Sequence, residues 1–334
     1  MQFPTLPVEL WREISRLATY TPICFDTSLH PDTWNPEAKE FIDRYEVNFR
    51  TKRALTLVSR QIRRISLDFL CDIIIIDSEV YNPAVGVVCK QLGRVSKLIQ
   101  YLPTTQHFLM GLDGLGHSYL EGAARSLEQI LRKCNNLRGL HLSFPSMGIH
   151  QFSNSLSLRH DRSLQMQVAG VVCPGLQFLS VQGTIWENVY EKMLDRVSLS
   201  LRAHHMSAWT RRDALGSTMI AYPEEIHVPQ LESFHWSTVM DTQMSFSKFG
   251  MRALTYLVIG IPSPRNLLTH ILESARDSIL TLRLERRCVV DIDVLSIALS
   301  AARLQHLGYP ICLTSVAWLN DQLRHDTLRE ISVV

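Results

Sequence analysis

The stretch Leu254-Thr255-Tyr256-Leu257-Val258-Ile259 is one copy of a six-residue phrase that recurs through the second half of the chain. Its first, fourth and sixth residues are apolar or aromatic, and the next copy, Ile279-Leu280-Thr281-Leu282-Arg283-Leu284, keeps this pattern. Five copies begin at positions 231, 254, 279, 304 and 328, so successive copies start 23 to 25 residues apart. Such even spacing predicts a repeated structural unit.

Each copy is expected to contribute one short strand. Alternate side chains of a strand point to opposite faces, so the fourth and sixth residues of every copy would enter one shared core. The segments between copies predict return helices, at 87–102, 187–201, 266–275 and 292–299. This combination of period and phrase is typical of leucine-rich repeats. We therefore predict an α/β chain (α+β overall) that builds an irregular leucine-rich-repeat-like solenoid with a curved parallel sheet.

The first half of the chain continues the pattern less regularly. Copies of the phrase stand at 137–142 and 176–181, and strands are also expected at 73–76 and 107–112, the first because it is a run of β-branched isoleucines. The stretch 183–227 breaks the rhythm and is interpreted as a helix followed by an insertion. A doubly wound α/β domain remains an alternative, because it also alternates strands and helices.

The N-terminal stretch Leu6-Pro7-Val8-Glu9-Leu10-Trp11-Arg12-Glu13-Ile14 predicts a helix. Proline suits the first turn of a helix, where its missing N–H costs nothing. Apolar residues then recur at the spacing of one helical face, at Leu10, Ile14 and Leu17. A second helical block is expected to begin near Thr51, a residue type favoured at helix N-caps. Its apolar stripe consists of Leu55, Val58, Ile62 and Ile65.

Together, these two segments resemble the F-box, a small helical module that docks on a Skp-type adaptor in cullin-based ubiquitin ligases. The matching residues are Leu6-Pro7-x-Glu9-Leu10-x-x-x-Ile14-x-x-Leu17 and Leu57-Val58-Ser59-Arg60-x-Ile62-Arg63-Arg64. The opening looks especially like the F-boxes of mushroom-forming fungi. The resemblance implies that the adaptor contacts come from Leu6, Pro7, Leu10, Ile14, Leu57, Val58 and Ile62.

The chain departs from the F-box pattern in two ways. The family often has cysteine and tryptophan where Ser59 and Ile62 stand. The two matching halves are also further apart than in a compact F-box, because an insertion at about 23–49 separates them, and its prolines and polar residues predict a surface loop. We therefore divide the chain into an F-box-like helical module, 1–72, and an irregular leucine-rich-repeat-like domain, 73–334.

The resemblance implies a substrate-recognition subunit of a cullin-based, SCF-type ubiquitin ligase. The expected partners are a Skp-type adaptor, a cullin scaffold and an unknown target protein. The repeats would bind the target through side chains that alternate away from the core and line the exposed face of the sheet. The candidates for these contacts are His235, Thr255, Arg283, His306 and Arg329.

Two other functions stay open. The chain could be a non-catalytic repeat scaffold whose N-terminal helices only cap the solenoid, since the first repeat would otherwise expose its core. It could also be an enzyme with an unrecognised α/β site, which would need a deep pocket with converging polar groups. The stripe of Leu10, Ile14 and Leu17 discriminates the first two functions. A cap would turn this stripe onto the repeats, whereas a docking module would leave it exposed.

No motif for catalysis, cofactor binding or metal binding stands out, so we expect neither an enzyme nor a bound cofactor. Gly111 to Gly116 has its glycines in the wrong order for a dinucleotide fingerprint. The absence of a Cys-x-x-Cys pair argues against structural zinc. His204-His205 is interpreted as a pair on a solvated loop. Asp291-Ile292-Asp293 is interpreted as the start of a helix, where acidic residues favour the helix dipole.

Charge and composition exclude further classes of partner. The net charge is +2, from 34 basic and 32 acidic side chains, which predicts no contact with nucleic acid or with an anionic membrane. No apolar run approaches the roughly 20 residues that span a bilayer. The seven cysteines form no close pairs, which predicts a reducing compartment, the cytoplasm or the nucleus.

Overall fold

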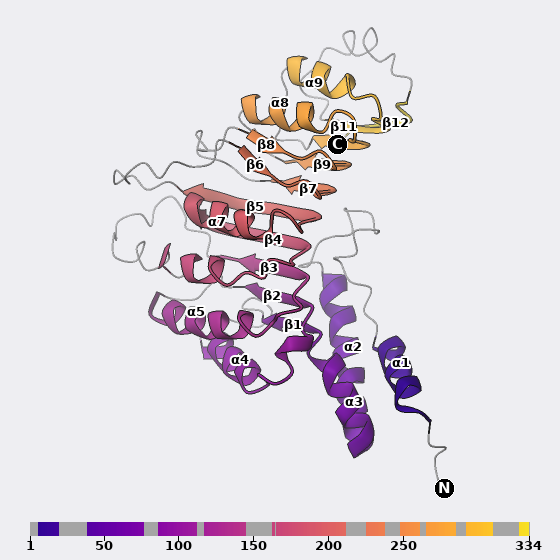
Figure 1. The fold of residues 1–334 in the computed structure, drawn as a ribbon, viewed down its shortest axis with the longest axis vertical. Helices are drawn as coiled ribbons and strands as arrows, with labels where there is room; N and C mark the ends of the chain where they lie inside the picture. Colours follow the sequence, from indigo (N-terminus) through magenta and orange to yellow (C-terminus); the bar gives the residue numbers. More distant parts are fainter. Residues whose placement is uncertain are drawn as a thin grey trace.

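The computed structural model describes residues 6–19, 39–76, 86–111, 117–144, 162–163, 165–211, 225–237, 248–260, 265–284, 292–309 and 327–333. These residues form an elongated stack, with the N-terminal helices at one end and the last strand near the other (Figure 1). Among them, no helix combines the length and the apolar character needed to cross a bilayer.

The described strands form one long parallel sheet and one short one. The strands of the long sheet are β1 (Ile73–Ile76), β2 (His107–Gly111), β3 (Gly139–Ser143), β4 (Phe178–Trp186), β5 (Ala203–Arg211), β7 (Ser233–Trp236), β9 (Tyr256–Ile259), β10 (Thr281–Leu284), β11 (His306–Tyr309) and β12 (Glu330–Val333). Their order in the sheet follows their order along the chain, while β6 (Glu225–His227) and β8 (Lys248–Gly250) pair separately. A doubly wound sheet reverses its strand order, so that alternative is wrong.

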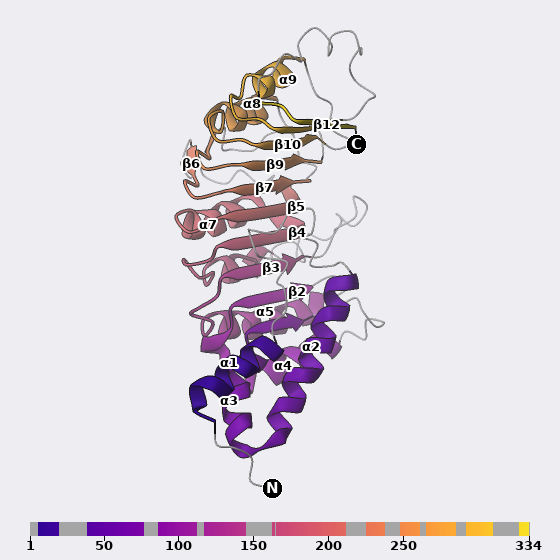
Figure 2. The same cartoon turned by 90° about the vertical axis from the view of Figure 1, so that its right-hand side faces the viewer.

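Helices between the strands return the chain along one side of the long sheet, behind the strands in Figure 2. They are α4 (Gly86–Ser96), the short 3₁₀ helix η2 (Leu102–Thr104), α5 (His117–Leu131), α7 (Glu187–Val197), α8 (Arg265–Ser274) and α9 (Ile292–Leu299). The helices predicted from the sequence at 187–201, 266–275 and 292–299 are confirmed. The helix predicted at 87–102 is shorter, because the chain leaves α4 through turns that lead into η2.

The core is a ladder of buried side chains in register across the parallel strands. Leu257 of β9 lies opposite Phe234 of β7 and Leu282 of β10, and all three side chains are buried. Burial of one such side chain contributes about 1.5–3 kcal/mol. The ladder joins one contiguous cluster that also includes inward-facing residues of α5, α7 and α8. The predicted strand positions in the repeated phrase are therefore confirmed.

The stretch 183–227, which we expected to contain an insertion, holds a further repeat. It supplies the end of β4, helix α7 and the whole of β5, which pairs with β4 and β7. The sequence pattern hides this unit because a histidine, His204, stands where the other units have an apolar residue. His204 is buried in the core, so the interpretation of His204-His205 as a solvated loop pair is wrong.

The N-terminal module contains three described helices, α1 (Val8–Ala18), α2 (Lys39–Val58) and α3 (Arg60–Leu70). The helix start expected near Thr51 is wrong, because Thr51 lies inside α2 and its hydroxyl donates to the carbonyl of Val47. Residues 39–49, which we expected in a surface loop, form the first half of α2. The rest of that expected insertion, 23–38, lies outside the described residues. Ser59 begins α3, where its hydroxyl accepts the amide hydrogen of Ile62 at 3.1 Å.

Candidate docking site

Apolar side chains of the N-terminal module stay open to solvent. Val47 and Phe49 in the middle of α2 are exposed. The exposed residues within the two F-box-like segments are Val8, Leu10, Ile14 and Leu17 on α1 and Leu57 and Val58 at the end of α2. Their exposed fractions range from 41% to 78%, so none belongs to the core. We call these six residues the N-terminal apolar surface. Exposed apolar side chains grouped on one short helix, as on α1, mark interaction sites more often than isolated ones do.

Helix α1 packs on its neighbours through Ser15, Thr19 and the half-buried Trp11, and Leu10, Ile14 and Leu17 stay exposed. Ser15 is buried within the helix and Thr19 is buried just after it, with the Thr19 hydroxyl donating to the carbonyl of Ser15 at 2.7 Å. The contacts of α1 with other elements are mainly to α3 and α2. An amphipathic helix in a folded domain ordinarily buries its apolar side. The opposite orientation leaves that side available to a partner.

The predicted adaptor-binding residues all lie among the described residues. Pro7, Leu10, Ile14, Leu57 and Val58 are exposed, while Leu6 and Ile62 are half-buried. Pro7 stands at the N-cap of α1, where its carbonyl accepts the amide hydrogen of Trp11 at 3.1 Å. Sequence reasoning did not select two further exposed residues of the same surface, Val8 and Leu17, although both belong to the predicted helix.

A buried ion pair joins α2 to the start of the long sheet. Lys52 Nζ lies 2.5 Å from Asp72 Oδ1, and the lysine side chain is 2% exposed. Burial raises the pKa of the Asp72 carboxyl above its ordinary value, and the opposing effect of Lys52 is smaller. The Asp72 carbonyl also accepts the amide hydrogens of Gln106 and His107, which lead into β2. One residue thus links the helical module to the first two strands.

Tyr45 forms a second link between α2 and the sheet. Its hydroxyl donates to the carbonyl of Ile73 in β1 at 3.4 Å. The ring packs against a buried cluster that includes Ile73 of β1 and Leu109 of β2. Burial raises the pKa of the Tyr45 phenol, so the phenol keeps its proton at neutral pH. The first half of α2 therefore covers the beginning of the sheet face that the return helices leave open (Figure 2).

The predicted target-binding residues divide into two groups. His235 and Arg283 occupy the same outward row of the long sheet, on β7 and β10, with Val258 of β9 between them. His306 lies in the adjacent row, and its Nδ1 is 3.2 Å from the Glu330 carboxylate of β12. These three residues lie on the outward face of the sheet, and their role as target contacts stays a prediction.

Thr255 and Arg329 were wrongly placed on that face. Each precedes its strand by one residue, so neither belongs to the outward rows. The Thr255 hydroxyl donates to the carbonyl of Glu232 at 3.0 Å, which fixes the turn before β9. The repeated phrase begins before the strand does, and only its third and fifth residues point outward.

A row of polar side chains crosses the outward face from β3 to β7. His141 Nδ1 lies 2.8 Å from Ser180 Oγ, which lies 3.5 Å from His205 Nδ1. The rings of His205 and His235 stack at 4.5 Å between centroids. Burial lowers the pKa of His141 to about 4 and that of His205 well below its ordinary value, where neighbouring histidines add a smaller effect. These two rings are therefore neutral at pH 7.

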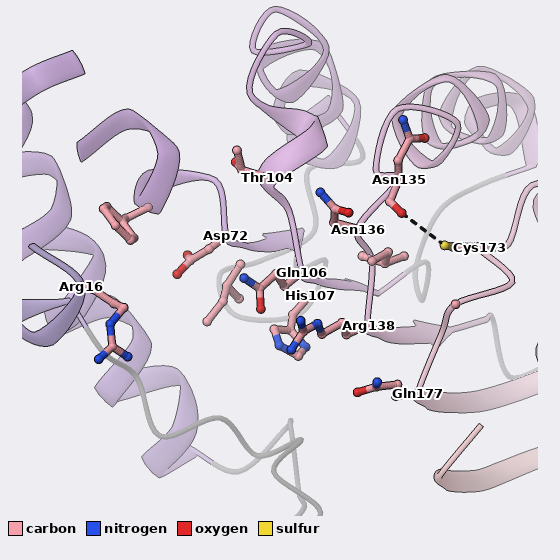
Figure 3. A pocket seen from close by; sticks show the side chains of 14 residues that line it. Arg16, Asp72, Thr104, Gln106, His107, Asn135, Asn136, Arg138, Cys173 and Gln177 are labelled. Carbon is pink, nitrogen blue, oxygen red and sulfur yellow. Dashed lines mark hydrogen bonds between the residues drawn. The ribbon is translucent and has the colours of Figure 1, made fainter. Parts of the chain in front are cut away.

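An open pocket of about 680 Å³ lies where the helical module meets the repeats (Figure 3). Arg16 of α1 and Phe69 of α3 form one side, and residues that precede β1 to β4 form the other. Its lining residues include Asp72, Thr104, Gln106, His107, Asn135, Asn136, Arg138, Cys173 and Gln177. Within the described ranges, no group of three or more histidine, cysteine or acidic side chains is placed to hold a metal ion.

Comparisons with known proteins identify no family. No protein-family model matches the sequence, and no curated protein matches it. Among solved structures, the chain is similar to the leucine-rich repeat-containing protein LegL7 from Legionella pneumophila, with 14% sequence identity and a TM-score of 0.30. The similarity covers 78% of this chain and 82% of that one. The repeat architecture of this chain therefore rests on its own strand order and register.

Proposed function

We propose that this chain is the substrate-recognition subunit of a cullin-based, SCF-type ubiquitin ligase. In this role α1 to α3 dock on a Skp-type adaptor, which connects to a cullin scaffold, and the repeats bind a target protein. The observation that supports the proposal is the N-terminal apolar surface, whose side chains face solvent instead of the repeats. Apolar side chains exposed by an otherwise packed module are typical of a surface that a second protein covers.

The exposed residues coincide with the F-box-like pattern. Leu10 and Ile14 stand one turn apart on α1, in the arrangement by which an amphipathic helix enters an apolar groove of a partner. Leu57 and Val58 supply the second matching half. Ser59 departs from the family pattern, yet it leaves this surface intact because it acts as the N-cap of α3. Ile62 is half-buried, so we expect a smaller contribution to docking from it.

The attachment of the module to the sheet supports a role in presentation. The links through Lys52 and Tyr45 hold α2 against the first strand. A target bound to the repeats would then be held at a set position relative to the adaptor. Tethering of this kind raises the effective concentration of the target near the ubiquitin-carrying enzyme. The chain itself does no bond chemistry in this role, which it would perform in the cytoplasm or the nucleus.

The alternative is a non-catalytic scaffold whose helices only cap the repeats. One observation favours it for α2, because Tyr45 and Lys52 pack against the start of the sheet. Helix α1 does not fit this alternative, since Leu10, Ile14 and Leu17 are exposed and not packed against the repeats. The two functions therefore differ in what they predict for α1.

Binding of the full-length chain to a purified Skp-type adaptor tests the proposal. The variant Leu10→Ser/Ile14→Ser removes two exposed apolar contacts and is expected to weaken adaptor binding by at least about tenfold. The matched control is Ile99→Ser/Leu199→Ser, because these residues are comparably exposed on other parts of the chain. Failure of the unaltered chain to bind the adaptor, or equal binding by both variants, would contradict docking and favour the scaffold.

A further inference from the structure

The pocket between the helical module and the repeats has the dimensions of a ligand site. Its volume of about 680 Å³ falls in the range of roughly 300–1,000 Å³ that small-molecule sites occupy. Figure 3 shows Gln106, His107 and Arg138 close together at its centre, with Asp72 and Arg16 on one side and Gln177 on the other. The pocket shares no lining residue with the N-terminal apolar surface.

Most of the charge in the pocket is already compensated. The Arg16 guanidinium binds Glu13, with Nη2 to Oε1 at 2.6 Å. The Asp72 carboxylate binds Lys52 at 2.5 Å. Arg138, by contrast, has no carboxylate partner among the residues that the structure describes. Among the described residues that line the pocket, Arg138 is therefore the charged side chain without an opposite charge beside it.

The repeats contain an internal comparison for Arg138. A backbone ladder places Gln106, Arg138, Gln177, Arg202 and Glu232 at equivalent positions before successive strands, since the amide hydrogen of each residue bonds to the carbonyl of the one before it. In this ladder Arg202 is neutralised by the next residue, with its Nη2 at 2.6 Å from the Glu232 Oε1. Arg138 instead stands between two uncharged amides. The same position thus carries an arginine paired with a carboxylate in one repeat, Arg202, and in another repeat an arginine flanked by uncharged amides, Arg138.

The surroundings of Arg138 suit an oxyanion. The amide groups of Gln106 and Gln177 are exposed on either side of it and can donate hydrogen bonds. His107 lies beneath, and it fits only because residue 139 is glycine, since a Cβ there would meet the ring nitrogen Nδ1. Burial of the ring, with a smaller effect from Arg138, lowers the pKa of His107 to about 3. His107 is therefore neutral at pH 7 and does not replace Arg138 as the source of charge.

We propose that this pocket binds an anionic side chain of an extended peptide segment from a protein partner, with Arg138 as the anchor and Gln106 and Gln177 as flanking donors. The guanidinium can bind a carboxylate or a phosphoryl group through two parallel hydrogen bonds. The amide of Asn135 can pair with the peptide backbone, because it both donates and accepts. The amide nitrogen of Asn136 already donates to the Pro103 carbonyl. The proposal does not depend on adaptor docking and stands or falls separately from it.

The test measures binding of three labelled probes to the full chain by fluorescence anisotropy. The probes are capped alanine pentapeptides whose central residue is serine, glutamate or phosphoserine. At least one of the two anionic probes is expected to bind about tenfold or more tightly than the serine probe, as a charge-assisted hydrogen bond implies. A preference shared by glutamate and phosphoserine identifies any anionic residue as the source. A preference for phosphoserine alone identifies a phosphorylated one.

Two substitutions at equivalent ladder positions complete the test. Arg138→Gln is expected to abolish the preference for the anionic probes, and Arg202→Gln is expected to keep it, because Glu232 already neutralises Arg202. Arg138→Lys, which keeps the charge, should retain part of the preference and so separates loss of charge from loss of fold. The proposal is overturned if the unaltered chain shows no preference for either anionic probe, or if Arg138→Gln retains it.

Discussion

His204 and Tyr190 face each other inside the core, with 2.8 Å between His204 Nε2 and the tyrosine oxygen. The other ring nitrogen, Nδ1, lies 2.9 Å from the carbonyl of Leu179. A carbonyl can only accept a hydrogen bond, so Nδ1 carries the proton and Nε2 accepts from the tyrosine hydroxyl. Both polar groups are satisfied, which explains how a histidine takes a place in an apolar ladder.

Substitution of His204 alone should be costly. His204→Leu restores the repeat phrase but removes the hydrogen bond between the buried Tyr190 hydroxyl and His204 Nε2, which is expected to cost about 1–3 kcal/mol of unfolding free energy. The double variant His204→Leu/Tyr190→Phe removes both polar groups and should recover most of that loss. Urea unfolding of the single and double variants checks the prediction. Equal stabilities of the two variants would show that the pair is not coupled.

His204 should contribute to a fall of stability in mild acid, as should the buried His107, His141 and His205. Burial lowers the folded-state pKa of His204 to about 4 from the ordinary 6.5. The unfolded chain therefore binds the proton first as the pH falls, and the contribution of His204, full above pH 6.5, is lost towards pH 4. The two pKa values imply a loss of about 3 kcal/mol over this window. Unfolding free energies measured between these pH values should fall less steeply for His204→Leu/Tyr190→Phe than for Tyr190→Phe, which keeps the histidine.

Two glycine substitutions should have opposite effects. Gly183 has a φ of +82°, and a Cβ there would run into the backbone carbonyl of Phe144, so Gly183→Ala should cost more than about 2 kcal/mol. Gly122 lies in α5, where an added methyl group would meet no surrounding atom within 4 Å, so Gly122→Ala should gain about 0.5–1 kcal/mol. The melting temperatures of both variants check the prediction. An unchanged melting temperature for Gly183→Ala would mean that the end of β4 can shift.

Loss of Lys52 should weaken the link between the helical module and the sheet. Lys52→Met leaves the Asp72 carboxylate without its counter-ion in a largely buried site, which is expected to cost about 3 kcal/mol. The control Lys133→Met changes an exposed lysine and should stay within about 0.5 kcal/mol of the unaltered chain. Equilibrium unfolding gives both values. If Lys52→Met proves as stable as the control, Tyr45 and the backbone bonds suffice to hold α2.

The period of the repeated phrase was enough to predict most of the array. Leu257 and Leu282 stand at equivalent places in two copies, and in the structure they lie opposite each other in register. The repeat with β5 was missed because its second core position is His204, and only the tertiary contacts with Tyr190 and Leu179 make that residue acceptable there. A pattern of apolar residues does not predict a core position that is filled by a polar residue, because the hydrogen-bond partners of that residue are distant in sequence.

The helical module and the pocket were less predictable for similar reasons. In the segment that precedes Thr51 the apolar residues are spread around the helix and form no stripe on one face. The sequence pattern therefore did not predict the first half of α2. The exposed surface of α1 was predicted through Leu10 and Ile14, because its residues are close in sequence. The pocket around Arg138 unites residues from four separate turns, and its unbalanced charge depends on neighbours that the linear sequence does not show.

The order of the strands has a consequence for how the chain is made. Each strand of the long sheet pairs with those that come immediately before and after it within that sheet, and no such pair is further apart in sequence than Gly139 and Phe178. A growing polypeptide can therefore fold one repeat as soon as the helix and strand of that repeat have left the ribosome. Assembly during translation would proceed from β1 towards β12, so that each folded repeat provides the strand edge on which the next repeat pairs.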